Sequence, residues 1–469
     1  MASLADRANI GPAADGSVAA LGWPLLVAVL AAAAVLLGWT GFIASDDQFY
    51  YEGALRWAEA GPFAGDSHWT TRFPLVLTLA AAIRGFGASE AAMIATSLAW
   101  YVAFVLAGWL LARRLAAERA AWAAALLLAT MPVIATSASI VNCDLPESTF
   151  LMLGAYLLAG EVGRARPSRC LLAGVAFGLA ILCRETAVLA LAGFGILFLA
   201  GRPLPRAAVF AAGCGAALVL LGEAAFQWAM TGDPLHRYSL AFNHDSSLDR
   251  AANEEGNLLV HPLIDPLLVL FVNNEFALLF WLAVPACLSL RRAGFDWRRF
   301  APMGAMAAAS FVLVALLSHK LVLNPRYFTP TACAAAILVG AWLMRMGRRR
   351  ALLLGMAAVG ANLAMLSLQN NHPRWTSQAL VEAAAADPGR LVTGDADAVE
   401  RAQLMLHWQG LANVRPDAGY VLVPADQARG APVAATFPAP WRPAGRIAAL
   451  LGVEIARLKA GTDMVLIRR

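Results

Sequence analysis

Long apolar runs separated by short polar loops are the dominant pattern of this chain. The runs are 20–43, 89–112, 117–140, 147–163, 169–183, 186–201, 206–230, about 266–290, 300–318, 327–346 and 351–369. A helix needs about 20 apolar residues to cross the hydrocarbon core of a bilayer. Several runs are shorter, so their ends are approximate. The pattern predicts an all-α polytopic membrane protein with about 11 transmembrane helices over residues 20–369, preceded by a cytoplasmic tail at 1–19.

Two apolar stretches are not predicted to cross the membrane. Residues 73–87 are apolar but short, and counting them as a span would move two basic loops to the outer side. We therefore predict an interfacial helix there, on the outer face of the membrane. Asn273, Asn274 and Glu275 would be costly in mid-bilayer, so we expect 263–272 to lie on the surface and the span to start near Phe276.

Composition supports the membrane interpretation. Hydrophobic residues make up 60% of the 469 residues and charged residues only 14%, against about 25% charged in soluble domains. This excludes an ordinary soluble enzyme, a disordered chain and a fibrous repeat. The net charge of +5 does not predict nucleic-acid binding, because the basic residues lie in short loops between apolar runs. None of the six cysteines forms a CxxC pair, so no disulfide framework or cysteine metal site is predicted.

The loops divide into two sets by charge. The loops 113–119, 164–169, 202–206, 291–299 and 345–350 hold 16 arginines in 33 residues. The loops of the other set, at 44–88, 141–146, 184–185, 231–265 and 319–326, hold 8 basic and 13 acidic residues in 96. The positive-inside rule places the first set in the cytoplasm and the second set outside.

Residues 370–469 have a different character. Pro, Asp, Gly and Gln return, and no apolar run there is long enough to span a membrane. Strands are predicted at 390–395, 419–426 and 464–469, and a helix at 396–409. The sequence therefore predicts a small α/β domain at 370–469 on the outer, periplasmic side.

Polar side chains collect at the outer ends of the predicted spans. Asp46 and Asp47 follow the first span, and Asp144 and Glu147 precede a later one. Each pair has two open interpretations: capping a helix N-terminus, or acting as a general base, an acceptor-positioning group or a metal ligand. Arg184 follows in the next outer loop, where it could form a local ion pair or bind a phosphate.

A basic patch in HKLVLNPRYFTP (319–330) stands out. Cations on an outer loop run against the positive-inside trend. Lys320, Arg326 and Tyr327 could be snorkelling anchors at a membrane edge, or could neutralise a leaving phosphate. Acidic and basic groups together at a membrane surface suggest chemistry on an anionic lipid headgroup.

The order of these motifs resembles a known family. An acidic pair after the first span, an interfacial segment, NCDLPES, the hairpin FGLAILCRETAVL and a late NxRYFxP patch are similar to GT-C class membrane glycosyltransferases. The resemblance is greatest to the bacterial branch related to protein O-mannosyltransferases and the lipid A aminoarabinose transferase. It covers roughly residues 20–370. One departure is Arg184, which stands where that branch often has Lys.

The resemblance implies a polyprenyl-phosphate sugar donor and a lipid, glycan or protein acceptor, with transfer by inversion at the periplasmic face of a bacterial inner membrane. Asp46 or Asp47 would lie at the reacting centre and act as the base on the acceptor hydroxyl or bind a divalent cation, and Asp144 and Glu147 would position the acceptor or a metal. The phosphate-binding set would be Arg72, Arg184, Lys320, Arg326 and Tyr327. A divalent cation, Mg²⁺ or Mn²⁺, could be held by Asp46, Asp47 and Glu147.

Three other functions remain open from the sequence. One is a polysaccharide ligase or polymerase that uses a diphosphate-linked glycan. The second is a transporter or flippase, which should carry ionisable groups near mid-membrane; Glu223 is the main such residue here. The third is a non-catalytic scaffold carrying its outer domain.

Overall fold

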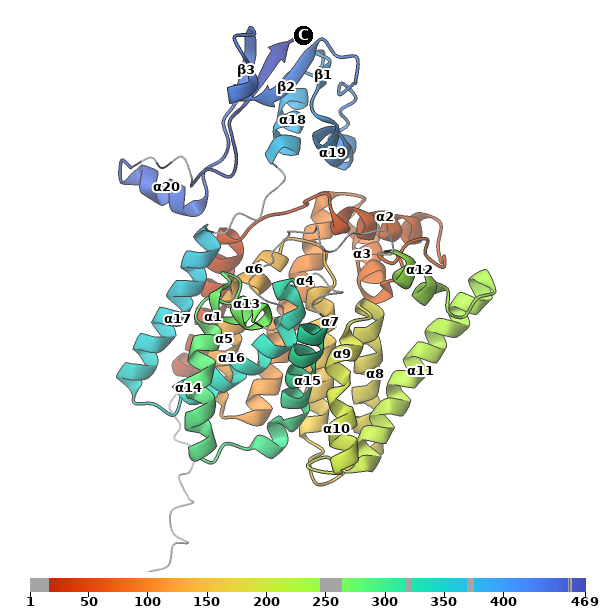
Figure 1. Cartoon of the computed structure of the whole chain (residues 1–469), viewed down its shortest axis with the longest axis vertical. Coiled ribbons are helices and arrows are strands. Elements are labelled where there is room, and N and C mark those ends of the chain that lie inside the picture. The colour runs from red at the N-terminus through yellow and green to blue at the C-terminus, as the bar shows by residue number, and fades with distance from the viewer. Residues whose placement is uncertain (1–16, 245–263, 318–322, 369–374, 454, 456–457) are drawn as a thin grey trace, which may run out of the picture.

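The computed structural model describes residues 17–244, 264–317, 323–368, 375–453, 455 and 458–469. Most of it is a bundle of helices, with residues 375–469 above one end of the bundle (Figure 1). The bundle helices are α1 (Ser17–Leu37), α2 (Asp46–Glu59), α3 (Phe73–Phe86), α4 (Glu90–Leu115), α5 (Glu118–Thr130), α6 (Pro132–Ser137), α7 (Asp144–Ala159), α8 (Pro167–Cys183), α9 (Ala187–Leu191), α10 (Gly193–Ala200), α11 (Arg206–Thr231), α12 (His236–His244), α13 (Asp265–Val272), α14 (Leu279–Arg292), α15 (Trp297–Leu316), the 3-10 turn η1 (Pro325–Phe328), α16 (Thr329–Leu343) and α17 (Arg348–Leu368).

Four of the described helices are long and apolar enough to cross a membrane. They are α4, α11, α15 and α17. Shorter apolar helices cover Gly22–Leu37, Phe73–Phe86, Pro167–Cys183 and Ala187–Ala200. The expected total of about 11 spans stays a prediction.

Several predicted runs are interrupted. The run 117–140 is two helices, α5 and α6, because Pro132 cannot donate the backbone hydrogen bond that would continue α5. The run 186–201 is likewise divided into α9 and α10. The break expected near Asn273 and Asn274 separates α13 from α14, which begins at Leu279. The expected helix at 73–87 is α3.

Small residues let two helices approach closely. A Cβ at Gly174 of α8 would lie 1.8 Å from the Ala212 carbonyl oxygen of α11, and one at Gly215 would lie 2.0 Å from the Leu171 carbonyl oxygen. Helices in membranes associate through such contacts because lipid tails are as apolar as the side chains themselves. Glycine at these two positions therefore fixes α8 against α11.

The upper face is the end of the bundle where α1 and α8 end, α7 begins and α17 ends, as drawn in Figure 1. The Arg-rich loops that follow α4 and α14 lie at the opposite end. Buried contacts of Ala34 with Ala135 and Leu366 bring the ends of α1 and α17 together. Helices α1, α6 and α17 are thus neighbours at this end of the bundle.

A four-stranded sheet forms the core of residues 375–469. Its order is β1-β2-β4-β3, with β1 parallel to β2 and the other pairs antiparallel. The elements are α18 (Trp375–Ala386), β1 (Val392–Thr393), α19 (Ala396–Trp408), β2 (Tyr420–Pro424), η2 (Ala425–Gln427), β3 (Val433–Phe437), α20 (Pro443–Leu450) and β4 (Met464–Arg468). Strands β1, β2 and β4 and helix α19 lie where the sequence predicts them, whereas β3 was not predicted. It is mostly exposed, so its sequence lacks the alternation typical of a half-buried strand.

The sheet region and the bundle share one hydrophobic cluster. Tyr51 and Ile83 from the upper face are buried together with Trp375, Leu406 and Leu466. The division of the chain at residue 370 into two domains stays a prediction, because this core crosses it.

Candidate functional site

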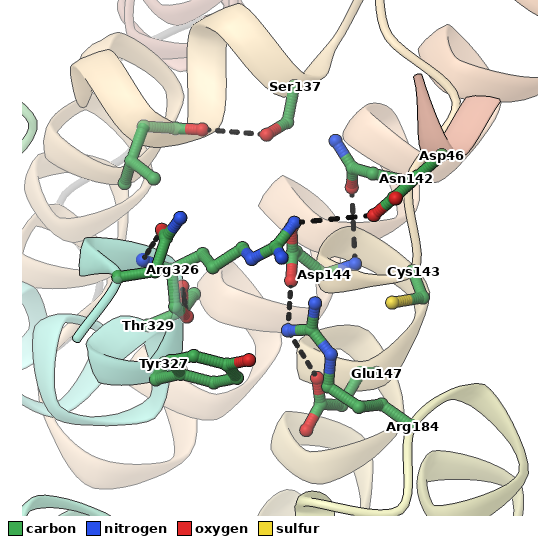
Figure 2. A network of polar contacts seen from close by, with 12 residues as sticks. Asp46, Ser137, Asn142, Cys143, Asp144, Glu147, Arg184, Arg326, Tyr327 and Thr329 are labelled. Carbon is green, nitrogen blue, oxygen red and sulfur yellow. Dashed lines mark hydrogen bonds and ion pairs between the residues drawn. The ribbon is translucent and has the colours of Figure 1, made fainter. Parts of the chain in front are cut away.

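Four separate segments meet at the upper face. They are the start of α2, the start of α7, the residue after α8 and the turn η1 (Figure 2). Each segment contributes a charged side chain from a helix end, and these side chains point toward one another. The residues that the sequence singled out on these segments are Asp46, Asp144, Glu147, Arg184, Arg326 and Tyr327, and they form one cluster.

Arg184 is the buried centre of this cluster. Its Nη1 donates to Oδ1 of Asp144 and lies 3.6 Å from Oε2 of Glu147. All three side chains are almost fully buried. The Asn142 side-chain oxygen accepts from the Asp144 backbone N–H at 3.1 Å and holds the turn that starts α7. A buried charge needs such partners, so this arrangement fixes the guanidinium in place.

Arg326 is a second guanidinium on the open side of the cluster. Its Nη1 lies 3.7 Å from Oδ2 of Asp46, and the two side chains are 33% and 36% exposed. The Asn324 side-chain oxygen accepts from the Arg326 N–H at 3.1 Å, and the Thr329 hydroxyl donates to the Arg326 carbonyl at 2.7 Å. These bonds set the turn η1, whose Pro325 has the backbone angle such a turn requires.

Tyr327 lies close to both cations. Its ring centroid is 5.2 Å from Cζ of Arg184 and 5.8 Å from Cζ of Arg326. Cation–π attraction therefore helps to hold two like charges near each other. The site therefore places two guanidinium groups, which have the charge and geometry to bind an anion, beside the partly exposed carboxylate of Asp46.

Asp47 has different surroundings from its neighbour. It is fully buried, and its carboxylate accepts from the Ile43 N–H at 2.7 Å and the Ser45 N–H at 2.8 Å. These amides precede α2, so the Asp47 carboxylate stabilises the loop between α1 and α2. Ser45, at the N-cap position, makes no capping bond through its side chain to the described backbone.

Arg72 lies behind the cluster. It is buried, and its Nη1 donates to the Tyr50 hydroxyl and lies 3.5 Å from Sγ of Cys143, the residue before Asp144. Burial raises the pKa of the Tyr50 hydroxyl well above its ordinary value, although Arg72 opposes this shift. The structure therefore ties Arg72 to Tyr50 and does not place it beside Asp46.

Arg237 is a central residue that the sequence analysis missed. This side chain of α12 is fully buried and donates to the carbonyl oxygens of Thr71, Ile181 and Leu182 at 2.6 to 3.1 Å. It also donates to Oε1 of Glu185 at 2.6 Å. These acceptors belong to the two segments that carry Arg72 and Arg184. Its only sequence signal was that it is one of two arginines in the outer loop 231–265.

Lys320, predicted to bind phosphate, lies outside the described residues. The predicted metal ligands Asp46, Asp47 and Glu147 do not form one donor set, because Asp47 binds backbone amides and Glu147 faces Arg184. Among the described residues, no group of three or more His, Cys, Asp or Glu side chains is arranged to hold a metal ion.

An apolar cavity of about 460 Å³ opens near the upper face. Helix α3 contributes Phe73, Pro74, Leu77 and Thr78 to its wall. The remaining lining residues are Trp57, Trp100, Phe150, Leu179, Leu182, Glu223 and Phe226. Since Leu77 is 41% exposed, the cavity is bordered by a surface that would face lipid.

Comparison with known proteins agrees with this architecture. The family model described as dolichyl-phosphate-mannose-protein mannosyltransferase matches residues 71–226. The crystal structure of ArnT from Cupriavidus metallidurans bound to undecaprenyl phosphate matches with a TM-score of 0.62 and 14% identity, over 95% of this chain and 98% of that chain. The fold is that of the GT-C class of membrane glycosyltransferases.

A second GT-C structure matches over less of its own length. The archaeal oligosaccharyltransferase AglB from Archaeoglobus fulgidus, in complex with an inhibitory peptide and a dolichol-phosphate, has a TM-score of 0.55 and 15% identity, over 87% of this chain and 70% of that chain. The Archaeoglobus fulgidus oligosaccharyltransferase in complex with Zn and sulfate has a TM-score of 0.54 and 15% identity, over 85% of this chain and 68% of that chain. No curated protein matches the chain. The GT-C fold thus extends through almost the whole chain.

Proposed function

We propose that this chain transfers a sugar from a polyprenyl-phosphate donor to a lipid, glycan or protein acceptor at the upper face. The observation that carries the proposal is the accessible Asp46 carboxylate facing Arg326 beside Arg184. The GT-C fold supports it, as do the undecaprenyl phosphate of the ArnT structure and the dolichol-phosphate of the AglB structure.

The reaction follows from the two kinds of charge. Asp46 takes the proton from the acceptor hydroxyl while the acceptor oxygen attacks the anomeric carbon of the donor sugar. The bond from that carbon to the phosphate oxygen breaks, and polyprenyl phosphate leaves with the electron pair. Arg326 stabilises the charge that grows on the phosphate, and Arg184 adds a second positive group. A single displacement inverts the anomeric configuration.

The other predicted site residues take supporting roles in this proposal. Asp144 and Glu147 hold Arg184 and border the acceptor side. Arg72 supports the cluster from behind through its contacts with Tyr50 and Cys143. Lys320 stays a predicted phosphate-binding residue.

The cavity beside α3 fits the lipid part of the donor. Its lining is almost entirely apolar and aromatic, and it opens next to exposed apolar surface. A polyisoprenoid chain presented from the bilayer would bury its tail there, since apolar burial is the driving force for such binding. The buried Glu223 in its wall is the observation that favours the transporter alternative.

The distribution of arginines along the bundle indicates which face is periplasmic. The Arg-rich loops lie at the end of the bundle opposite the candidate site. The positive-inside rule then makes the upper face periplasmic in a bacterial inner membrane. Nucleotide sugars are not available on that side, which fits a lipid-linked donor.

Metal dependence gives the first test. The carboxylates of the cluster face guanidinium groups or backbone amides and do not converge on one point. We therefore expect a chelator to leave the initial rate of transfer unchanged. Loss of transfer with the chelator, restored by Mg²⁺ or Mn²⁺, would contradict this donor arrangement.

Donor class gives the second test. The purified chain in liposomes is supplied with radiolabelled polyprenyl-monophosphate sugars and membrane extract, and release of polyprenyl phosphate is measured. The proposal expects turnover of a monophosphate donor. Turnover of a diphosphate-linked glycan alone would favour the ligase or polymerase alternative. Lipid movement across the membrane without cleavage would favour a flippase.

A further inference from the structure

An exposed apolar patch lies on the α20 segment of the C-terminal region. It comprises Ile447, Leu450, Leu451, Val453 and Ile455, which we call the α20 patch. Leu450 and Leu451 are 86% and 77% exposed. Scattered exposed apolar residues are ordinary in proteins, but five within nine positions indicate a surface that is covered in use.

The orientation of α20 is fixed by its opposite face. A Cβ at Gly445 would lie 2.8 Å from the Trp441 ring and 2.9 Å from the Leu458 carbonyl oxygen. The Arg442 N–H donates to that same Leu458 carbonyl at 2.8 Å. Because this side is packed so closely, the patch cannot turn inward without undoing these contacts.

The patch lies at the level of the upper face. Arg442 donates from Nη1 to the carbonyl oxygen of Leu368, the last residue of α17, at 3.1 Å. Helix α17 is one of the helices long and apolar enough to cross a membrane. Figure 1 shows α20 apart from the sheet, beside the upper end of α17. The patch is therefore held where the membrane surface would be.

The flanking side chains are those of a membrane boundary. Arg442 and Arg446 lie at the start of α20, which contains no acidic residue, and the one acidic residue in the sequence of the patch segment is Glu454. Trp441 is half-buried, and Nζ of Lys459 lies 5.3 Å from the centroid of its ring while pairing with Asp463 at 2.9 Å, so the arginines are the cations left for lipid phosphates. Cations beside an apolar surface can reach lipid phosphates while the apolar side chains enter the acyl region, and Trp favours this boundary.

We infer that the α20 patch is a second membrane contact, which dips into the lipid leaflet at the upper face. The occupant is lipid because a membrane helix ends beside the patch and cations rim it. A protein partner fits less well, because stable protein interfaces use about 20 to 30 residues a side and the patch has five. The contact would hold the C-terminal sheet at a fixed height above Asp46 and Arg326.

The test measures the depth of single labels in the full-length chain. Cys214 and Cys287, the exposed cysteines, are replaced by alanine. An environment-sensitive fluorophore is then placed at Leu451→Cys. The matched control is Val433→Cys on β3, an apolar site of the same region that is 52% exposed. Each protein is reconstituted in nanodiscs of phosphatidylethanolamine and phosphatidylglycerol, with and without nitroxide-labelled lipids.

The inference expects blue-shifted emission at position 451 that lipid nitroxides quench, and unshifted, unquenched emission at position 433. Equal, solvent-like emission at both positions would overturn it. A blue shift at 451 that lipid nitroxides do not quench would also overturn it, in favour of cover by protein. A label at Ile455→Cys repeats the measurement in case the first substitution disturbs the fold. Intact folding is checked by the thermal unfolding temperature, and sugar transfer plays no part in the readout.

Discussion

At the residue scale, the neighbouring carboxylates Asp46 and Asp47 have separate tasks. Asp47 is fully buried and satisfies two loop amides, whereas Asp46 is partly exposed beside Arg326. The sequence identified the pair as candidate site residues but could not show which one is buried in the loop and which one is accessible, since both stand at the start of one helix. The hydrogen bonds from the Ile43 and Ser45 amides to Asp47 make this distinction.

This difference predicts that the same substitution destabilises the fold more at position 47 than at position 46. Asp47→Ala should lower the free energy of unfolding by roughly 1–3 kcal/mol, because two buried amides lose their acceptor. Asp46→Ala should change it by less than about 1 kcal/mol, as expected for a partly exposed ion pair. Thermal unfolding in detergent measures both. A larger loss for Asp46→Ala than for Asp47→Ala would contradict the assignment.

At the element scale, Arg237 joins α12 to the two segments that carry Arg72 and Arg184. Burial raises the pKa of Glu185, but Arg237 and Arg72 lower it more, so it lies below its ordinary value of 4.5. A lowered carboxyl pKa contributes stability above the unfolded-state pKa, and this contribution is lost as pH falls through the folded-state value.

Glu185→Gln should therefore be less stable than the wild type at pH 7, and the gap should close as pH falls below about 4.5. Denaturation midpoints measured across this range test it. Glu59→Gln, on the surface helix α2, is the control, since Glu59 is exposed. A gap that stays constant with pH would show that the Glu185 charge does not stabilise the fold.

Most helices were predictable because apolar runs of spanning length have few other solutions in a membrane protein. The polar pair Asn273 and Asn274 correctly predicted the break before α14. The break between α5 and α6 was not predicted, although Pro132, which lacks a backbone N–H donor, could have signalled it. The α12 contact was not predictable. A polar loop carries no periodic pattern, and burial of Arg237 depends on carbonyl groups that α8 exposes only at its end.

At the scale of the whole molecule, the C-terminal region and the bundle are joined by aromatic side chains. Trp408 donates from Nε1 to the Tyr51 hydroxyl at 3.0 Å, and its ring lies 5.1 Å from that of Phe42 and 5.3 Å from that of Tyr51. Phe42 and Tyr51 flank the segment that carries Asp46. The position of this acid is thus coupled to a region more than 350 residues away in sequence.

Trp408→Ala should lower the stability of the whole chain by less than the roughly 3–5 kcal/mol typical of a fully buried aromatic, because Trp408 is half-buried. It should also lower the transfer rate, because the loop before Asp46 loses its support. Trp228→Ala is a matched control, since Trp228 is 66% exposed on α11. Unchanged stability and rate in Trp408→Ala would mean that the two parts act independently.

The most direct test of the account is the initial rate of sugar transfer by Asp46→Asn, compared with wild type and with Glu52→Gln. Glu52 is an exposed acid on the same helix, bonded to Gln48. The account predicts that Asp46→Asn folds normally and loses about 100-fold or more of the rate, the contribution of a general base, whereas Glu52→Gln keeps wild-type activity. Wild-type transfer by a well-folded Asp46→Asn variant would contradict it.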